Sequence, residues 1–343
     1  MARPLVYILD APRERSPLLS QFYQRLQRDD CPVECVMCSH KNQSRPIIEN
    51  LVKMIERDLG HRVPDYIHLG FLRIDSLLSP DAVKYIGRHG IRVITEVGDI
   101  SGLLPVIHRF DGGCHADIII LRAQSRHNIP DNVIPFLERK SYYDGASRKY
   151  KPSPLYDAKP VFIPWCGDPG VYAGAYANTD RDIELAFIAT VTSNFKYHDT
   201  RRGFIRSIQA MRGHRTVIAS KVYGQEYIDI LGHSKMLVVD DSERGILTQK
   251  YIEAALSGTV MIGTVPCYAA DILQDNVHML EATPATLAVT MDRLLSDTGL
   301  MARLRKSAYD LIKNEYNIIR ATNIYETTIM EEYYARHRNS SGR

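Results

Sequence analysis

The sequence predicts an α/β protein with two domains, each built around a parallel β-sheet. Short apolar runs rich in β-branched residues alternate with longer amphipathic segments, which is typical of βαβ units. The alternation stops between residues 140 and 180 and then starts again. A chain of 343 residues also suits two cores of roughly 150 residues each better than one large core.

The first half alternates predicted strands and helices. The strands are 5–9, 33–37, 66–70, 91–97 and 116–122, and the helices between them are 17–28, 46–59 and 79–88. Between 140 and 180 the chain is rich in Tyr, Pro, Gly, Asp and Lys, apart from a predicted strand at 160–164. We place the domain junction there, with a first domain at 1–155 and a second at 156–320.

The second half repeats the pattern and then becomes helical. Its predicted strands are 184–191, 215–220, 236–239 and 260–265, with helices at 200–211, 226–234 and 248–256. From Ala285 onward, apolar residues recur at helical spacing. The last segment, 321–343, is predicted to be a helix long enough to reach back to the first domain, followed by a polar tail.

Composition excludes several classes of protein. Forty-three Lys and Arg residues against 40 Asp and Glu give a net charge of only +3, so the overall charge does not predict a polyanionic partner. No apolar run approaches the roughly 20 residues that span a bilayer, and the N-terminus has no apolar signal stretch. We therefore expect a cytoplasmic protein without a membrane span. The six cysteines show no paired zinc spacing, so no metal site and no cofactor are predicted.

Residues 247–263 are the most informative about function. Their sequence predicts a loop, a helix and a strand. Thr248 stands at the N-cap position of the helix, whose first-turn amides and dipole would attract an anion such as a diphosphate. Lys250 adds a positive charge, and Glu253 lies one turn further along the helix, where a carboxylate can hold ribose hydroxyls. Gly258 ends the helix. An ordinary capped helix with a surface Lys and Glu explains the same pattern.

Several segments resemble the C-terminal half of group-1-type glycosyltransferases, and more narrowly the branch that contains the CgeB-like proteins. The resemblance covers roughly 160–325 and is carried by four segments: Phe162–Pro169, Asp182–Thr190, Leu231–Asp240 and Leu247–Thr259. It implies a GT-B fold, in which two Rossmann-like domains face each other across a cleft. It also implies metal-independent transfer of a hexose from a UDP-, GDP- or dTDP-sugar to a hydroxyl acceptor.

By that resemblance the donor binds the second domain. Glu253 would contact the ribose, and the turn at Leu247 and Thr248 would contact the diphosphate. One departure concerns the sugar: many relatives have a second Glu eight residues before the first, and this chain has Gly245 there. Donor identity and the stereochemistry of transfer therefore stay open.

Basic residues after the first strand of the second half are candidates for stabilising the leaving diphosphate. They are Lys196, Arg201 and Arg202, and we favour Arg202 over Arg201 as the catalytic residue. Thr190 and Lys196 are assigned to donor binding, together with Lys221 and Tyr223, which lie where the base would stack.

Acidic residues at strand ends of the first half are candidates for a general base. Asp10, Glu96 and Asp99 follow apolar strands, so their carboxylates are expected to face the cleft. We assign Glu96 and Asp99 as catalytic candidates. Strand-end acids also commonly cap loops, which is the structural interpretation of the same residues.

The acceptor is unassigned, and a small molecule, a glycan and nucleic acid remain open. The basic, tyrosine-rich segment 139–151 would suit a nucleic-acid acceptor, and an ordinary interdomain loop has the same composition. A nucleotide-sugar epimerase, a phosphorylase and a non-catalytic nucleotide-sugar or glycan binder also fit this architecture. A nicotinamide dehydrogenase does not, because no GxGxxG motif follows the first strand. Oligomeric state is not predicted.

Overall fold

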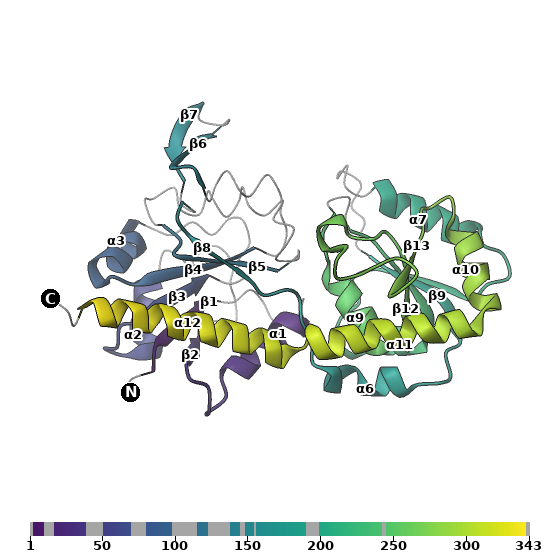
Figure 1. Cartoon of the computed structure of the whole chain (residues 1–343), viewed down its shortest axis with the longest axis horizontal. Helices are drawn as coiled ribbons and strands as arrows, with labels where there is room; N and C mark the ends of the chain where they lie inside the picture. Colours follow the sequence, from purple (N-terminus) through teal and green to yellow (C-terminus); the bar gives the residue numbers. More distant parts are fainter. Residues whose placement is uncertain are drawn as a thin grey trace.

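The computed structural model contains two α/β domains that lie side by side (Figure 1). It describes residues 3–9, 17–38, 51–69, 80–97, 115–122, 138–144, 148–153, 156–189, 199–241 and 245–340. No helix within these ranges is long and apolar enough to cross a membrane.

The first domain is built on a six-stranded parallel sheet with the order β2-β1-β3-β4-β5-β8. Its strands are β1 (Leu5–Leu9), β2 (Glu34–Met37), β3 (Tyr66–Leu69), β4 (Arg92–Val97), β5 (Ile118–Leu121) and β8 (Lys159–Phe162). The helices described around it are α1 (Pro17–Leu26), α2 (Leu51–Leu59) and α3 (Pro80–His89). Each predicted strand of this half is present within two residues of its expected limits.

Alternate residues of β1 explain how two helical layers cover this sheet. Val6 and Ile8 pack with α1 on one face. Tyr7 and Leu9 pack with α2 and α3 on the other face. Successive side chains of a strand point to opposite faces, so a strand covered on both sides is apolar at every position.

The second domain has a five-stranded parallel sheet with the order β10-β9-β11-β12-β13. The strands are β9 (Ile183–Ile188), β10 (Thr216–Ala219), β11 (Ser234–Val239), β12 (Val260–Gly263) and β13 (Met279–Glu281). The helices are α6 (Pro169–Ala177), α7 (Asp199–Ala210), α8 (Gly224–His233), α9 (Gln249–Ser257), α10 (Leu287–Ser296) and α11 (Thr298–Glu315). Phe187 packs with α7 and α10, whereas Ala186 and Ile188 face α8 and α9.

The domain boundary differs from the predicted one. β8 pairs with β5 and so belongs to the first sheet, which moves the junction from residue 155 to beyond Phe162. The crossing segment contains Gly167, where an added Cβ would lie 2.5 Å from Leu256 of α9 and 3.1 Å from Leu18 of α1. A side chain at this position would require the Leu256 side chain to move, so glycine allows the close approach of the two domains.

The chain crosses between the domains a second time, next to the first crossing. α11 lies along the second domain, and after Tyr316 and Asn317 the long helix α12 (Ile318–Ser340) runs along the first domain (Figure 1). At this point the Ile318 amide donates a 3.1 Å hydrogen bond to the Gly167 carbonyl. The two crossings are therefore held together.

α12 packs on the first domain, the position predicted for the C-terminal helix. The Tyr325 hydroxyl lies 3.1 Å from Nδ1 of His68 on β3. Arg28 donates two hydrogen bonds, of 2.6 and 2.7 Å, to the Glu326 carboxylate. The helix begins at Ile318, three residues before its predicted start.

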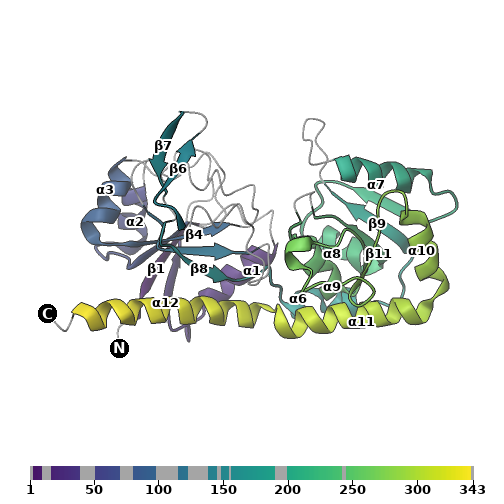
Figure 2. The ribbon, with the colours of Figure 1, turned by 45° about the horizontal axis from the view of Figure 1, so that its top comes forward.

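The segment from 140 to 180 contains structure that the sequence did not predict. The antiparallel hairpin of β6 (Ser141–Asp144) and β7 (Lys149–Pro152) projects from the first domain (Figure 2). It carries the basic segment considered for nucleic acid, and Tyr150 on it is 76% exposed. α6 follows, with Asp168 as its N-cap and Pro169 as its first residue.

Candidate functional site

The carboxyl edge of the second sheet gathers most of the predicted donor-site residues that the structure describes. β9 and β11 are neighbours, but the chain leaves β9 toward α7 on one face and β11 toward α9 on the other. Such a topological switch point creates a crevice at the carboxyl ends of the two strands, where open α/β sheets bind ligands. The first turns of α7 and α9 supply Arg201, Arg202 and Lys250 there.

α9 begins with a first turn that its N-cap residue leaves uncapped. Thr248 has the extended backbone of an N-cap, with φ −83° and ψ 162°, at the predicted position. Its Oγ1 makes no capping hydrogen bond and is buried without a hydrogen-bond partner among the described residues. Because first-turn amides lack intrahelical acceptors and carry a partial positive charge, this helix start suits an anion.

Two cations share one carboxylate between α7 and α9. Arg201 Nε donates a 2.8 Å hydrogen bond to Asp240 Oδ1, and Lys250 Nζ lies 3.9 Å from Asp240 Oδ2. Asp240 directly follows β11 and is 1% exposed. Asp240 thus brings two cations close together at the sheet edge.

Burial sets the protonation of Lys250. It lowers the pKa of the ammonium to about 8, with the neighbouring Asp240 acting in the opposite direction and Arg201 in the same one. The positive charge beside Asp240 therefore depends on pH near this value.

Glu253 lies one turn beyond Lys250 and is 4% exposed. Its Oε2 accepts a 2.8 Å hydrogen bond from the Tyr227 hydroxyl of α8. Burial raises the pKa of the Glu253 carboxyl to about 7, although Tyr227 and the charge of Lys250 act to lower it. The side chain thus faces the packing between α8 and α9, and its predicted contact with a ribose stays a prediction.

The two arginines of α7 have different neighbours. Arg202 pairs with Asp199 in the same first turn, and 30% of its side chain is exposed. Arg201 is the residue that lies against the carboxylate shared with Lys250. The geometry therefore favours Arg201 over Arg202 for contact with an anion at the start of α9, the reverse of the order that the sequence suggested.

Lys221 and Tyr223 follow β10 at the same sheet edge. Lys221 is exposed and has a left-handed backbone with φ 58°. Tyr223 is 46% exposed and stands at the N-cap position of α8, where its side chain makes no capping hydrogen bond. An exposed ring at this edge is free of core packing, as stacking on a base requires, and that role stays a prediction.

Gly245 has a structural reason for being glycine. Its φ is +68°, and an added Cβ would lie 2.2 Å from Cys267 Sγ. Its amide donates to Asp241 and its carbonyl accepts from the Tyr268 amide at 2.8 Å. No glutamate fits here, so the departure from the pattern of relatives reflects a loop packed closely against Cys267 and Tyr268.

Leu247 is fully buried, so its side chain cannot face a donor and only its main chain is available. Thr190, Lys196 and Asp99 lie outside the described residues, as does Asp10. Among the described residues, no group of three or more His, Cys, Asp or Glu side chains gathers in metal-binding geometry.

Glu96 does not face a cleft, so that expectation was wrong. It is 2% exposed, pairs with Arg122 through both oxygens and accepts a 3.0 Å hydrogen bond from the Tyr23 hydroxyl. Burial alone would raise the pKa of Glu96, but the charge of Arg122 and hydrogen bonds from His68 and Arg122 lower it to about 2. A carboxylate held ionised in the domain interior is a structural group, because a general base must reach its substrate.

Several solved structures with a similar fold align with nearly the whole chain. Anabaena HepE, solved in complex with UDP and glucose, matches with a TM-score of 0.61 at 10% identity, over 96% of this chain and 100% of its own. Sucrose-phosphate synthase from Thermosynechococcus elongatus matches with a TM-score of 0.62 at 11% identity, over 97% and 100%. A glycosyltransferase from Rickettsia africae ESF-5 matches with a TM-score of 0.56 at 10% identity, over 97% and 98%.

The chain has the GT-B fold. Its two parallel sheets and helical C-terminal region match the GT-B glycosyltransferases over nearly their full length. No model of a protein family and no curated protein sequence matches the chain. The narrower resemblance to the CgeB-like branch of the GT-B proteins therefore stays a prediction.

Proposed function

We propose that the protein transfers a sugar from a nucleotide-sugar donor to a hydroxyl acceptor. The observation that carries the proposal is that Arg201 and Lys250 both approach Asp240 beside the start of α9, whose N-cap side chain makes no capping hydrogen bond. A donor diphosphate would lie there, with its oxygens on the first-turn amides and near the two cations. The HepE structures, solved with UDP and with UDP-glucose, have the same fold and support a nucleotide sugar as the ligand.

The proposed chemistry follows from the charges. The bond between the sugar C1 and the diphosphate oxygen breaks, the diphosphate keeps the electron pair, and the acceptor oxygen bonds to C1 as its hydroxyl proton leaves. Arg201, Lys250 and the amides of α9 lie where the negative charge of the leaving diphosphate grows, so they stabilise the transition state more than the bound donor. We propose that these fixed cations make the transfer independent of a divalent metal, and activity should then persist in EDTA.

Donor binding is tested first with nucleotides. Thermal unfolding is measured with UDP, GDP, dTDP, CMP and their sugars, because a ligand that binds only the folded state raises the melting temperature. One nucleotide family should raise it in the wild type and in Arg206→Met, which removes an exposed arginine of α7 away from the crevice. Lys250→Met should reduce the shift. A well-folded protein that responds to none of these nucleotides would contradict the proposal.

Turnover is tested separately from binding. Release of the nucleoside diphosphate from the donor so identified is followed with panels of glycans, small alcohols and oligonucleotides as acceptors. Acceptor-dependent release supports a transferase and names the acceptor class. Tight donor binding without release on any panel would favour the non-catalytic binding protein instead.

A further inference from the structure

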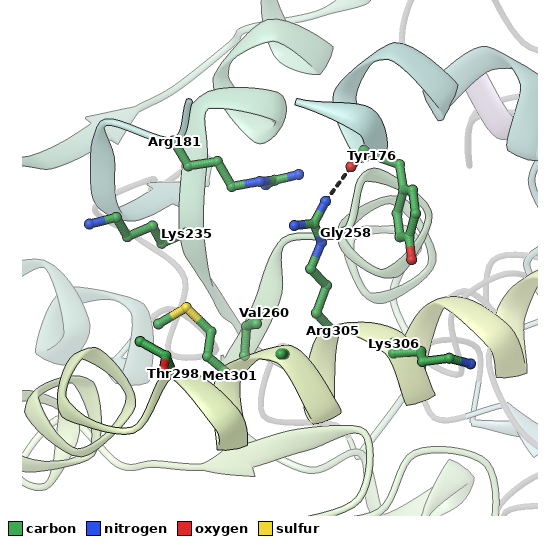
Figure 3. Close-up of a pocket in the computed structure, with 10 residues that line it drawn as sticks. Tyr176, Arg181, Lys235, Gly258, Val260, Thr298, Met301, Arg305 and Lys306 are labelled. Carbon is green, nitrogen blue, oxygen red and sulfur yellow. Dashed lines mark hydrogen bonds between the residues drawn. The ribbon is translucent and has the colours of Figure 1, made fainter. Parts of the chain in front are cut away.

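A cavity of about 430 Å³ lies at the amino edge of the second sheet, away from the switch-point crevice. It is bordered by Lys235 at the start of β11, Gly258 after α9 and the first turns of α11 (Figure 3). α9 therefore has its N-terminus at the proposed donor site and its C-terminus at this cavity. Neither the fold nor the proposed transfer reaction uses it.

The cavity is lined by positive charge. Of the ten described residues that line it, none is acidic and four are basic: Arg181, Lys235, Arg305 and Lys306. Lys306 forms an ion pair with Asp310 on the same helix, so its charge is balanced. Lys235 borders the cavity, but its ammonium points away from the two guanidiniums (Figure 3) and its charge acts on Glu184. Arg181 and Arg305 therefore give the wall its positive potential.

Arg181 is a largely buried cation held by helix ends. Its guanidinium donates to the carbonyls of Ala175 on α6, Leu231 on α8 and Ser257 on α9, at 2.7, 3.2 and 2.7 Å. Its remaining partners are also uncharged oxygens, such as the Ser234 carbonyl at 2.6 Å. The partial negative charges of three helix C-termini thus hold the arginine in place of a carboxylate.

Arg305 brings a second guanidinium toward the first (Figure 3). It donates to the Tyr176 carbonyl, and its Nε is buried without a hydrogen-bond partner among the described residues. Burial and the nearby charge of Arg305 lower the pKa of Arg181 to about 10. Two like charges at one wall repel each other, and an anion between them would stabilise both.

The rest of the wall is apolar and partly aromatic. The Tyr176 ring stacks on Tyr309 with centroids 3.8 Å apart, and the Arg305 guanidinium carbon lies 4.9 Å from the Tyr176 ring centroid. Val260 and Met301 complete this side. Apolar walls with a few convergent polar groups are typical of small-molecule sites.

We propose that this cavity binds a small organic oxyanion, with its charged group beside Arg181 and Arg305 and its apolar part against Tyr176, Val260 and Met301. The site is separate from the proposed donor site and does not depend on the transferase activity. Phenyl phosphate has both features and is small enough for the cavity.

The test is isothermal titration of the full chain with phenyl phosphate. We expect saturable binding, weakened by roughly tenfold or more in Arg305→Gln, which removes a positive charge from the wall. Lys235→Glu should also weaken it, because this change places a negative charge at the border of the cavity. Arg305→Gln keeps a donor for the Tyr176 carbonyl, and Lys235→Glu changes a partly exposed side chain, so folding is preserved in at least one variant. Arg303→Met, which removes an exposed arginine of α11 outside the cavity, should bind like the wild type.

Two controls distinguish binding at this cavity from binding at the proposed donor site and from binding by apolar contact alone. Lys250→Met should leave the binding of phenyl phosphate unchanged, whereas Lys235→Glu should weaken it. Benzyl alcohol, which lacks the charge, should not bind. Absence of binding at about 10 mM phenyl phosphate, a concentration that detects even weak sites, overturns the proposal. So does binding that Lys250→Met removes and Lys235→Glu leaves unchanged, or equal binding of benzyl alcohol.

Discussion

Arg201 and Asp240 join the start of α7, which follows β9, to the end of the neighbouring strand β11. The 2.8 Å hydrogen bond between Nε and Oδ1 links the first turn of α7 to the residue after β11. Lys250 approaches the other oxygen of the same carboxylate. Asp240 therefore holds Arg201 by a hydrogen bond and lies close to Lys250.

Arg201→Met should reduce turnover more than donor binding. Removing a cation that acts on the leaving diphosphate is expected to lower kcat about 100-fold with a smaller rise in KM. Initial rates with the donor identified by thermal shift measure both constants, and Arg206→Met on the same helix should behave like the wild type. A rise in KM with unchanged kcat would show that Arg201 serves binding only.

Nucleotide affinity should fall as the pH rises through about 8. The pKa of Lys250 is lowered to about 8, so the ammonium is charged below that pH and neutral above it. Binding of an anion near it is consequently strongest on the acid side of this transition. Titration calorimetry between pH 6.5 and 9.5, roughly one and a half units either side, measures the trend, which Lys250→Met should remove. An unchanged pH profile in that variant would exclude Lys250 as its source.

Gly245→Ala should destabilise the fold rather than restore a lost contact. The alanine would need a positive φ and would place its Cβ against Cys267 Sγ. We expect a loss of about 2 kcal/mol in the free energy of unfolding, measured with urea. Gly174→Ala is the matched control, because Gly174 is in α6 and has open space around its Cβ position, so this change should be neutral or stabilising.

Arg122→Met should strongly destabilise the first domain. The substitution leaves the Glu96 carboxylate buried without its main counter-charge, at an expected cost of about 3 to 5 kcal/mol in the free energy of unfolding. Glu96→Gln added to Arg122→Met should recover much of this loss. If the double variant is no more stable than Arg122→Met, the loss comes from Arg122 packing on Phe22 and Trp165 rather than from its charge.

Because the pKa of Glu96 is lowered in the folded protein, the free energy of unfolding should depend on pH. The pKa of Glu96 is about 2 in the folded protein and near 4.5 without these contacts. A carboxyl with a lowered folded pKa contributes stability above its unfolded pKa and loses it as the pH falls toward 2. Urea unfolding between about pH 6 and 3 should show this loss in the wild type and a smaller one in the double variant.

The apolar strands made most of the fold predictable. Runs such as Ile118–Leu121 are apolar at every position, which is typical of a strand that is buried on both faces of a parallel sheet. α6 was missed because its Gly- and Ala-rich sequence has no amphipathic period, although Asp168 and Pro169 are a standard helix start. The β6–β7 hairpin was missed because its Tyr and Lys residues lack the alternation of a half-buried strand.

The candidate site was predictable only where local sequence sets the geometry. Thr248 and Gly258 follow from the rules for helix ends, and both limits of α9 agree with the structure within one residue. Asp240 was missed because its importance depends on Arg201 and Lys250, which meet it only after folding. Glu96 was misassigned for the same reason, since a strand-end position does not reveal that Arg122 covers the carboxylate.

The break between α11 and α12 gives the molecule a mechanical property. The two helices form a nearly continuous rod along both domains, interrupted at Tyr316 and Asn317, where the Gly167 crossing is attached (Figure 2). If one domain rotates against the other, we expect the rotation to be centred on this joint. α12 would then move with the first domain, relative to the second. A small angle at the joint becomes a large displacement at the far end of α12, and a spectroscopic label near Arg338 would read out domain closure from a distance.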